Sequence, residues 1–320
     1  MGVEQSGTRT NPRLDLGVAL MEFIAQESDF IGTQALRLFR AQVQKGVFPA
    51  ITRECLTRSV NTKRAKRSGY NREGVITVDI SFACEEHGLE NALDDSERSL
   101  YESDFDAELA CTKQILNLLL IAQEVRIATA LFNTSTWAGA TLYTDNSGAP
   151  WDAAASDVIG QVLAAKEKVR ALTGMKPNAL IMSETNRIRL LSNTAIKAAI
   201  QYTTIPTEEA VTNALKGLFG VENILIGKAV KNTSNKGKDF SGSDIWSDDY
   251  AMVARIAQDS NSLEEPCVGR SMLWVADSPE NTTVEQYYED SIRSDVFRVR
   301  QNVDELVIDA SFAHLMKVDA

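Results

Sequence analysis

One long helical segment, between residues 99 and 133, dominates the hydrophobic pattern of this chain. No Gly or Pro occurs from Leu89 to Ala138. From Leu109 to Phe132, helical spacing gathers the apolar residues on one broad face. Roughly 30 residues in this conformation make a rod of about 45 Å, more than twice the length of an ordinary globular helix. The pattern therefore predicts a rod around which the rest of the chain is organised.

Upstream of the rod, the pattern first predicts an arm. Residues 1–12 are polar, and residues 14–43 carry apolar positions at mixed helical spacing. This spacing predicts one or two helices with a break near residues 30–32. The pair Phe48-Pro49 ends the arm, because the residue before a proline disfavours helix.

A hairpin is predicted next. Apolar and polar residues alternate strictly before residue 83, at Ile76, Val78, Ile80 and Phe82. This period of two is typical of a half-buried strand. Residues 85–88 are expected to close the hairpin, and the acidic segment 91–106 then leads into the rod.

After the rod, residues 152–263 alternate between helical and strand patterns, which is typical of an α/β unit. The predicted elements are a helix over 157–172, a strand over 178–182, helices over 183–191 and 194–202, a helix over 207–218, a strand over 223–227, a polar loop over 231–244 and an extended segment over 245–256. Thr207 is the expected N-cap of its helix, with Glu208 and Glu209 in the first turn.

The last part of the chain is predicted to consist of strands. The runs are 271–275, 282–288, 291–299 and 305–313. Leu306 to Ile308 are too apolar for an exposed tail, so they are expected to return to the long helix and pack against it.

Composition places the chain among ordinary globular proteins. It has 320 residues, of which 44% are apolar and 24% charged. The longest apolar run is far shorter than the roughly 20 residues that span a bilayer, and no secretory signal pattern begins the sequence. The four cysteines form no CxxC pair, which favours folding in a reducing, intracellular compartment.

Charge is distributed very unevenly. Residues 53–73 contain seven basic and two acidic residues, a net charge of +5, whereas the whole chain has −11 and the remainder therefore −16. Three interpretations stay open on charge alone. The segment is a solvated loop, a nucleic-acid patch that lacks aromatic residues for base stacking over 53–69, or a hairpin tip that meets a negative surface on another copy of the chain.

The sequence contains few residues suited to catalysis or to metal binding. His87 and His314 are the only histidines, and Cys84 with His87 has no second pair of ligands nearby in sequence. Neither a GxxxxGK[ST] nor a GxGxxG motif occurs. The pairs Asp94-Asp95 and Asp248-Asp249 are typical of a solvated surface. We therefore predict no enzyme activity, no catalytic or metal-binding residue and no cofactor.

Several phrases together resemble the major capsid proteins of tailed bacteriophages, which have the Hong Kong 97-type fold. These phrases are residues 118–125 with 130–133, residues 172–182, residues 215–221 followed by the strand 224–227, the pair Ile245-Trp246, and residues 269–274. Each phrase is weak alone, but their order and spacing over residues 40–315 are moderately specific.

The resemblance implies an α+β fold with named parts. An N-terminal arm would cover residues 1–47, and an extended β-hairpin loop, residues 48–88, would overlap a neighbouring subunit. A peripheral domain would comprise 89–151 and 264–320, with the spine helix at about 99–133. An α/β axial domain would comprise 152–263 and would surround the centre of hexamers and pentamers.

The implied function is that of a structural protein that assembles itself into the icosahedral head shell around a double-stranded DNA phage genome. The alternatives are the shell of an encapsulin-like nanocompartment and, more remotely, a soluble α/β enzyme. Expected partners are other copies of the chain, separate scaffold and portal proteins, and decoration proteins; no membrane is expected. The virion is the expected location, after assembly in the host cytoplasm. The expected inter-subunit contacts at the loop tip are Arg58, Lys63, Arg64, Lys66, Arg67 and Arg72.

Overall fold

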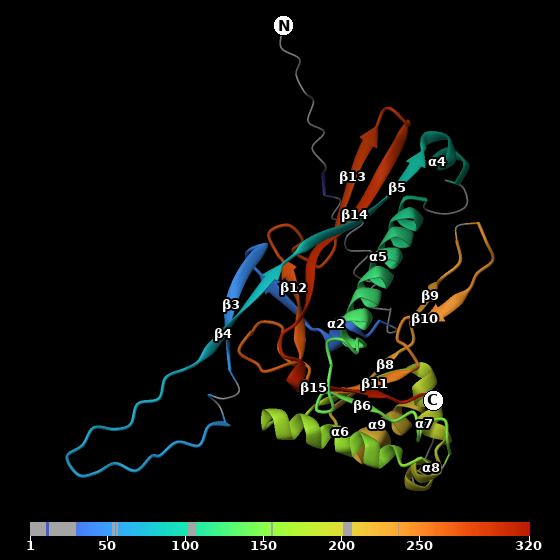
Figure 1. Ribbon diagram of the computed structural model, residues 1–320. Helices are drawn as coiled ribbons and strands as arrows, with labels where there is room; N and C mark the ends of the chain where they lie inside the picture. Colours follow the sequence, from blue (N-terminus) through green and yellow to red (C-terminus); the bar gives the residue numbers. More distant parts are fainter. Residues whose placement is uncertain are drawn as a thin grey trace.

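Two mixed sheets form the body of the molecule, and a long two-stranded ribbon projects from its flank (Figure 1). The computed structural model describes residues 11–12, 30–52, 55, 57–101, 107–154, 156–200, 207–235 and 237–320. The six-stranded sheet, here called the peripheral sheet, contains β1 (Asn11–Pro12), β13 (Thr283–Glu289), β14 (Ser294–Val307), β12 (Gly269–Trp274) and β2 (Leu38–Ala41) in that order, with β5 (Glu85–Asp94) also paired to β14.

The five-stranded sheet, here called the axial sheet, lies at the opposite end of the body (Figure 1). Its order is β6 (Tyr143–Asp145), β15 (Ala313–Lys317), β11 (Tyr250–Ala254), β7 (Ala179–Ser183) and β8 (Asn223–Gly227). The helices beside it are α6 (Val158–Thr173), α7 (Glu184–Ser192), α8 (Thr194–Ile200) and α9 (Glu208–Phe219).

The predicted long helix is present as α5 (Ala107–Leu131), with 25 residues and a length of about 37 Å. A separate helix, α4 (Asp95–Tyr101), precedes it, and residues 102–106 lie outside the described chain. The first part of α5, including Leu116 and Leu119, packs on Phe297 of the peripheral sheet. Its last turns pack Ile127 and Leu131 against the axial sheet. One rod therefore covers part of both sheets.

Among the described residues, α5 is the one helix long and apolar enough by those two criteria to cross a membrane. Half of its most apolar window is buried inside the protein. Long apolar helices in the core of a folded protein meet the same criteria of length and hydropathy. α5 packs against both sheets, as such a core helix does.

The α/β unit of residues 152–263, here called the axial unit, agrees closely with its sequence pattern. Asp157 caps α6 by accepting a hydrogen bond from Gly160, and Gly174 ends that helix with a φ of 73°. Ser183 and Thr207 cap α7 and α9 in the same way. Every residue of β7 is buried. Alternate residues of this strand face α6 and α9 on one side and α5 on the other, which explains why it is apolar throughout.

The arm differs from its prediction where it is described. Residues 13–29 lie outside the described chain, so most of the predicted helices there are not tested. The helix α2 (Gly32–Ala35) has four residues, and the following residues form β2 instead of continuing a helix. They pair in parallel with β12, so a tertiary contact overrides a helical pattern. Pro49 does not end the arm but lies inside the ribbon strand β3 (Lys45–Ile51).

Other differences arise from pairing between distant segments. Residues 85–88 do not close the hairpin, because they begin β5 and pair with β14. The predicted loop 231–244 contains a small ribbon, β9 (Val230–Asn232) and β10 (Gly242–Asp244). The run expected over 291–299 extends into one strand of 14 residues, β14, which also takes in 305–307, whereas the rest of the run expected over 305–313 contains a 3-10 helix (Ala310–Phe312) and the first residue of β15. Val307 of this strand reaches the core around the end of α5, as predicted for 306–308, whereas Leu306 packs near Phe82.

The axial sheet includes strands from outside residues 152–263. β15 lies between β6 and β11 in this sheet. Its pairing to β11 buries His314 and Leu315. The C-terminal segment therefore closes the axial core, which no local pattern in the sequence indicates.

Candidate inter-subunit surface

The ribbon of β3 and β4 (Thr77–Ala83) has an apolar face that the subunit covers only at one end. The register pairs Phe82 with Gly46, Ile80 with Phe48 and Val78 with Ala50, which places these side chains on one face. Near the body, Phe82 is 9% exposed and packs against Met272. Farther out, Val78 is 55% exposed and Ile76 is 47% exposed. The apolar face thus continues beyond the core that the subunit provides for it.

Beyond the ribbon, the chain forms a long exposed loop with little regular structure, drawn at the lower left of Figure 1. A turn at its tip is closed by a hydrogen bond from the amide of Ser68 to the carbonyl of Ala65, and Arg67 adopts a positive φ of 66° there. Tyr70 is 75% exposed, with the Arg64 guanidinium 4.6 Å from its ring centroid.

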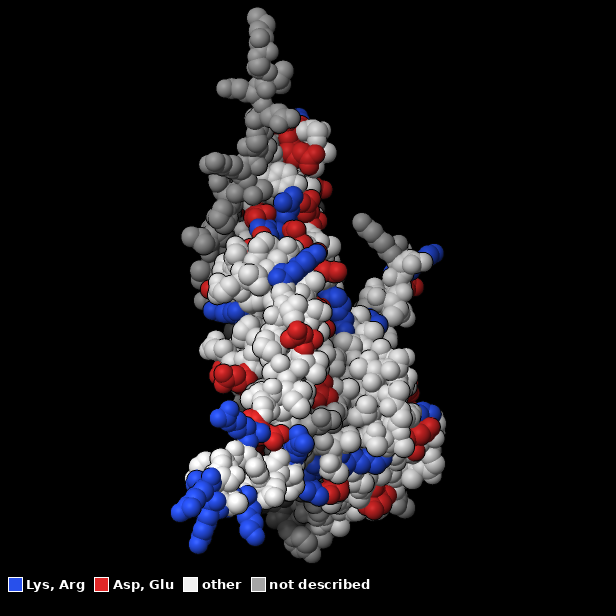
Figure 2. All heavy atoms as spheres, turned by 60° about the vertical axis from the view of Figure 1, so that its left-hand side comes forward, with Lys and Arg blue, Asp and Glu red and all other residues white. Residues whose placement is uncertain are grey.

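The predicted contact residues fall into two groups. Lys63, Arg64, Lys66, Arg67 and Arg72 are exposed around the tip, as Figure 2 shows in blue at the lower left. No ion pair joins any of these five to an acidic side chain within the described part of the chain. Arg58 lies in the neck of the loop and pairs with Glu73 at 3.0 Å. The structure therefore gathers five of the six predicted residues at the tip, where their charges are unpaired among the described residues.

The opposite end of the molecule is acidic. α4 and the turn between β13 and β14 lie together there, because Asp95 donates from its amide to the carbonyl of Arg293 and accepts from the hydroxyl of Tyr288. We call this region the acidic pole and define it by Asp94, Asp95, Glu97, Glu289 and Asp290. In Figure 2, basic side chains cluster at the lower left, and acidic side chains lie among some basic ones at the upper end. Each subunit thus carries complementary charge at separate ends.

The residues considered for metal binding and nucleophilic chemistry have structural roles. Burial raises the pKa of the Cys84 thiol to about 11, so it stays protonated at neutral pH, and it donates to the carbonyl of Met272. Burial lowers the pKa of His87. Among the described residues, no group of three His, Cys, Asp or Glu side chains is placed to hold a metal ion.

His314 is buried in β15 and takes part in a defined hydrogen-bond chain. Its Nδ1 donates to the carbonyl of Thr141 at 3.0 Å, so its Nε2 accepts from the Thr144 hydroxyl at 2.8 Å. The ammonium group of Lys168 donates to the same hydroxyl oxygen at 2.6 Å. Burial, with a smaller effect of Lys168, lowers the pKa of His314 to about 4. The imidazole is therefore neutral and anchors β15 to β6.

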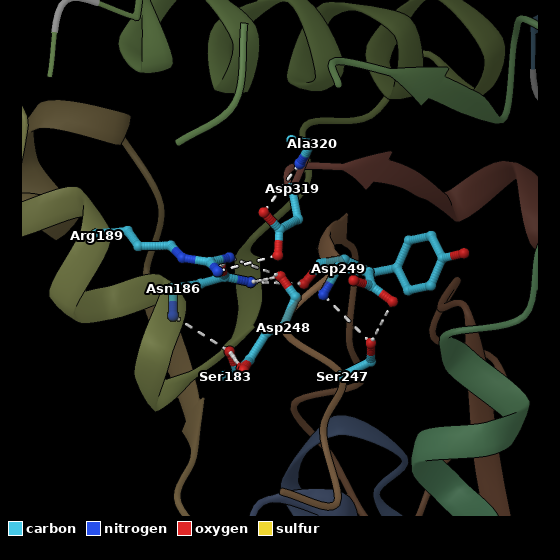
Figure 3. Close-up of polar contacts among 9 residues, drawn as sticks. Ser183, Asn186, Arg189, Ser247, Asp248, Asp249, Asp319 and Ala320 are labelled. Atoms are coloured by element: carbon cyan, nitrogen blue, oxygen red, sulfur yellow. Dashed lines mark hydrogen bonds and ion pairs between the residues drawn. The ribbon is translucent and has the colours of Figure 1, made fainter. Parts of the chain in front are cut away.

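Asp248, expected to be an ordinary surface residue, lies in a polar network that holds the C-terminus (Figure 3). Its carboxylate accepts from Ser183 at 2.6 Å, and its carbonyl accepts from Asn186 at 2.9 Å. Arg189 reaches the same carbonyl and also pairs with Asp319 at 3.0 Å. This network joins α7, the loop before β11 and the end of β15. Its polar groups satisfy one another, and the arrangement is that of a structural clamp.

A hollow of about 330 Å³ lies between α6 and the β6 region, bordered by Thr144, Asp157, Gln161 and Lys168 among others. Four of the polar side chains around it, Thr144, Asp157, Gln161 and Lys168, are engaged. The Asp157 carboxylate caps α6, and Gln161 bonds Trp151 and the carbonyl of Ala149. Lys168 is held by Thr144 and Ala140. These groups maintain the fold around the hollow.

Sequence reasoning missed two parts of this surface. The acidic pole combines residues 94–97, part of the acidic segment noted in the sequence, with residues 289–290. These two parts are almost two hundred positions apart, so their proximity was not predicted. The uncovered apolar face was present in the alternation over 76–82, but that pattern predicts a half-buried strand without saying what covers it. The charge count over 53–73 was the useful signal, because the tip is formed by consecutive residues.

The chain is similar to known phage proteins in both sequence and structure. No protein-family model matches the chain. The major capsid protein of Burkholderia phage BcepMu is 26% identical over 277 residues, which cover 85% of this chain and 87% of that relative.

Two solved structures extend the likeness to the fold. A phage-related protein from Bordetella bronchiseptica RB50 matches with a TM-score of 0.72 and 19% identity, over 96% of this chain and 97% of that one. The capsid of Cyanophage P-SCSP1u matches with a TM-score of 0.57 and 12% identity, over 100% of this chain and 92% of that one. The fold is therefore shared with a phage capsid over essentially the whole chain.

Proposed function

We propose that the ribbon and its loop join neighbouring subunits of a phage head, in which the chain serves as a structural capsid-shell protein with the Hong Kong 97-type fold that its sequence predicts. Other copies of the chain are its partners in a multi-subunit shell, and its role is structural, not enzymatic.

The uncovered apolar face of the ribbon is the observation that carries this proposal. An isolated two-stranded ribbon is marginally stable in water, and this one leaves Val78 and Ile76 about half exposed. Burying both side chains against another copy would gain about 2–3 kcal/mol from the hydrophobic effect. Repeated at every contact of a shell, such weak interfaces combine into a stable particle.

Charge complementarity supports a head-to-tail arrangement of subunits. The basic tip and the acidic pole occupy separate ends of the same molecule, so a tip and a pole meet only when they belong to different copies. An interface between two unlike patches generates rings when the rotation closes, as capsomers require. Opposite charges would guide encounter and register, with most of the binding energy supplied by the apolar ribbon.

We propose that subunits form hexamers and pentamers, that scaffold, portal and decoration functions belong to separate proteins, and that the shell encloses double-stranded DNA without reading its sequence. The acidic body supports confinement of DNA without tight binding. We further propose that assembly takes place in the host cytoplasm before DNA enters the shell.

Charge reversal at the tip tests the proposal. The change of Lys63, Arg64, Lys66 and Arg67 to Glu alters the tip by eight charge units. We expect a subunit with an unchanged thermal unfolding midpoint that forms no particles in negative-stain electron microscopy. Normal particles from this variant would contradict an electrostatic role of the tip.

A matched control separates the position of the charge from its amount. Reversal of four lysines of the axial unit outside the loop, Lys197, Lys216, Lys231 and Lys238, changes the net charge equally. We expect this control to assemble. Nucleic-acid content of the wild-type particles, measured by the ratio of absorbance at 260 and 280 nm, then distinguishes a genome-filled head from a protein-filled compartment.

A further inference from the structure

A single buried carboxylate connects three separate parts of the subunit. Glu124 lies on α5, with 2% of its surface exposed. One carboxylate oxygen accepts from the amide of Ile31 at 3.0 Å and from the indole Nε1 of Trp246 at 2.6 Å. The other oxygen accepts from the amide of Gly32 at 2.8 Å. The arm, the long helix and the axial unit therefore meet at one side chain.

Two glycines let the hydrogen-bond donors come close to this carboxylate: Gly32, whose own amide is a donor, and Gly227, which lies against the ring of Trp246. A Cβ atom at Gly32 would lie 2.5 Å from Glu124 Oε2, too close for any side chain. A Cβ atom at Gly227 would collide with the Trp246 ring that donates the third hydrogen bond. Both donors thus depend on positions where only glycine fits.

The apolar groups around the carboxylate come from the same three parts. Ile31 and Leu36 of the arm pack in one core with Ile127 of α5 and with Trp246. α2 lies beside the lower end of α5, where the two sheets approach each other (Figure 1). The anchor at Glu124 is therefore at the joint between the peripheral and axial sheets, and at the point where the arm enters the body.

The negative charge at this joint contributes little to the stability of the subunit itself. No Lys, Arg or His in the described part of the chain forms an ion pair with Glu124. Burial raises the pKa of Glu124. Because the folded-state pKa lies above the ordinary value, ionisation at neutral pH opposes folding relative to a neutral side chain. An apolar residue at this position would leave the amides of Ile31 and Gly32 and the indole N–H of Trp246 without an acceptor, so the carboxylate selects which segments meet.

We propose that Glu124 is a positioning residue that ties the N-terminal arm to the joint between the two sheets and thereby sets the geometry with which subunits join. This inference rests on the proposed role in a shell. Thirty residues precede Ile31 in the sequence. The Glu124 carboxylate fixes the backbone amides of Ile31 and Gly32, and its bond from Trp246 couples the same side chain to the axial unit.

The first test uses unassembled subunits, so its result does not depend on whether particles form. Glu124→Gln keeps the size of the side chain but turns an NH₂ group toward at least one of the three N–H donors. We expect the subunit to unfold cooperatively and trypsin to cleave after Arg37 or Arg40 roughly tenfold faster, as the loss of one charge-assisted hydrogen bond predicts. Mass spectrometry of the fragments identifies the cleaved bond.

The second variant and the control make the test specific. Trp246→Phe removes one donor and keeps an aromatic ring, so it should give a smaller increase in the same cleavage. Arg126 lies on the same helix as Glu124 and pairs with Glu305 of β14 at 2.9 Å. Glu305→Gln removes this ion pair and keeps the three hydrogen bonds of Glu124. We expect this control to leave cleavage after Arg37 unchanged.

The shell measurement completes the test. Particles assembled from Glu124→Gln subunits should show a broader or shifted diameter distribution in electron micrographs, with Glu305→Gln particles as the reference. Unchanged cleavage in both Glu124→Gln and Trp246→Phe would overturn the anchor. Faster cleavage with particles of wild-type diameter would overturn its role in shell geometry. Failure of all variants, wild type included, to form particles would instead contradict the proposed function.

Discussion

The strands β11 and β4 both carry apolar side chains, but these lie in opposite environments. In β11, Ala251, Met252, Val253 and Ala254 are completely buried between β15 and β7. In β4, only Phe82 is buried, and the strand pairs with β3 alone. These side chains of β11 are buried by other parts of the same subunit, whereas the subunit leaves Val78 on the apolar face of β4 exposed. The difference indicates which part of the chain folds the subunit and which part joins subunits.

The largest expected effect comes from a charge placed in β11. Val253→Asp buries a carboxylate among apolar side chains, and we expect the subunit to lose more than about 4 kcal/mol of its free energy of unfolding. Circular dichroism with urea titration measures this loss. A soluble subunit with wild-type cooperativity would mean that the axial sheet is not the folding core.

Acid should affect the axial sheet next most strongly, through His314. Its folded-state pKa of about 4 lies below the ordinary value of 6.5, so its contribution to stability is complete above pH 6.5 and is lost as the pH falls toward 4. We expect a loss of about 2 kcal/mol by pH 5. The unfolding midpoint of His314→Gln should depend less on pH over this range than that of the wild type. If the unfolding midpoint changed with pH equally in both proteins, His314 would not be the cause of the acid sensitivity.

The same substitution in β4 sharpens the comparison. Val78→Asp places the carboxylate at a position that is more than half exposed, so the free energy of unfolding should change by less than about 0.5 kcal/mol. Assembly should nevertheless fail, because the carboxylate would be buried in the contact between subunits. Val78→Ile is the matched control and should assemble. A large loss of subunit stability in Val78→Asp would mean that the subunit itself covers the ribbon.

The smallest effect is expected in the neck of the loop. Arg58 and Glu73 form an ion pair at 3.0 Å, but both side chains are more than half exposed. Glu73→Gln should therefore change neither the unfolding midpoint nor the yield of particles measurably. A strong assembly defect would show that the neck, and not only the tip, contributes to the contact.

The candidate surface was only partly predictable from the sequence. The basic tip was found because its residues are consecutive and carry a net charge that can be counted. The acidic pole and the full extent of the apolar face required coordinates. Glu124 gave no signal, because a glutamate on an amphipathic helix is normally solvated and its three donors lie 92 to 122 positions away.

Local sequence by itself determined the helices and inner strands of the axial unit. Asp157, Ser183 and Thr207 begin their helices and Gly174 and Gly220 end two of them through short-range hydrogen bonds and backbone conformations. Only the tertiary structure decided that residues 38–41 form a strand, that β14 is continuous and that β15 closes the axial sheet. Strand pairing joins segments far apart in the chain, so its free energy depends on partners that no local window contains.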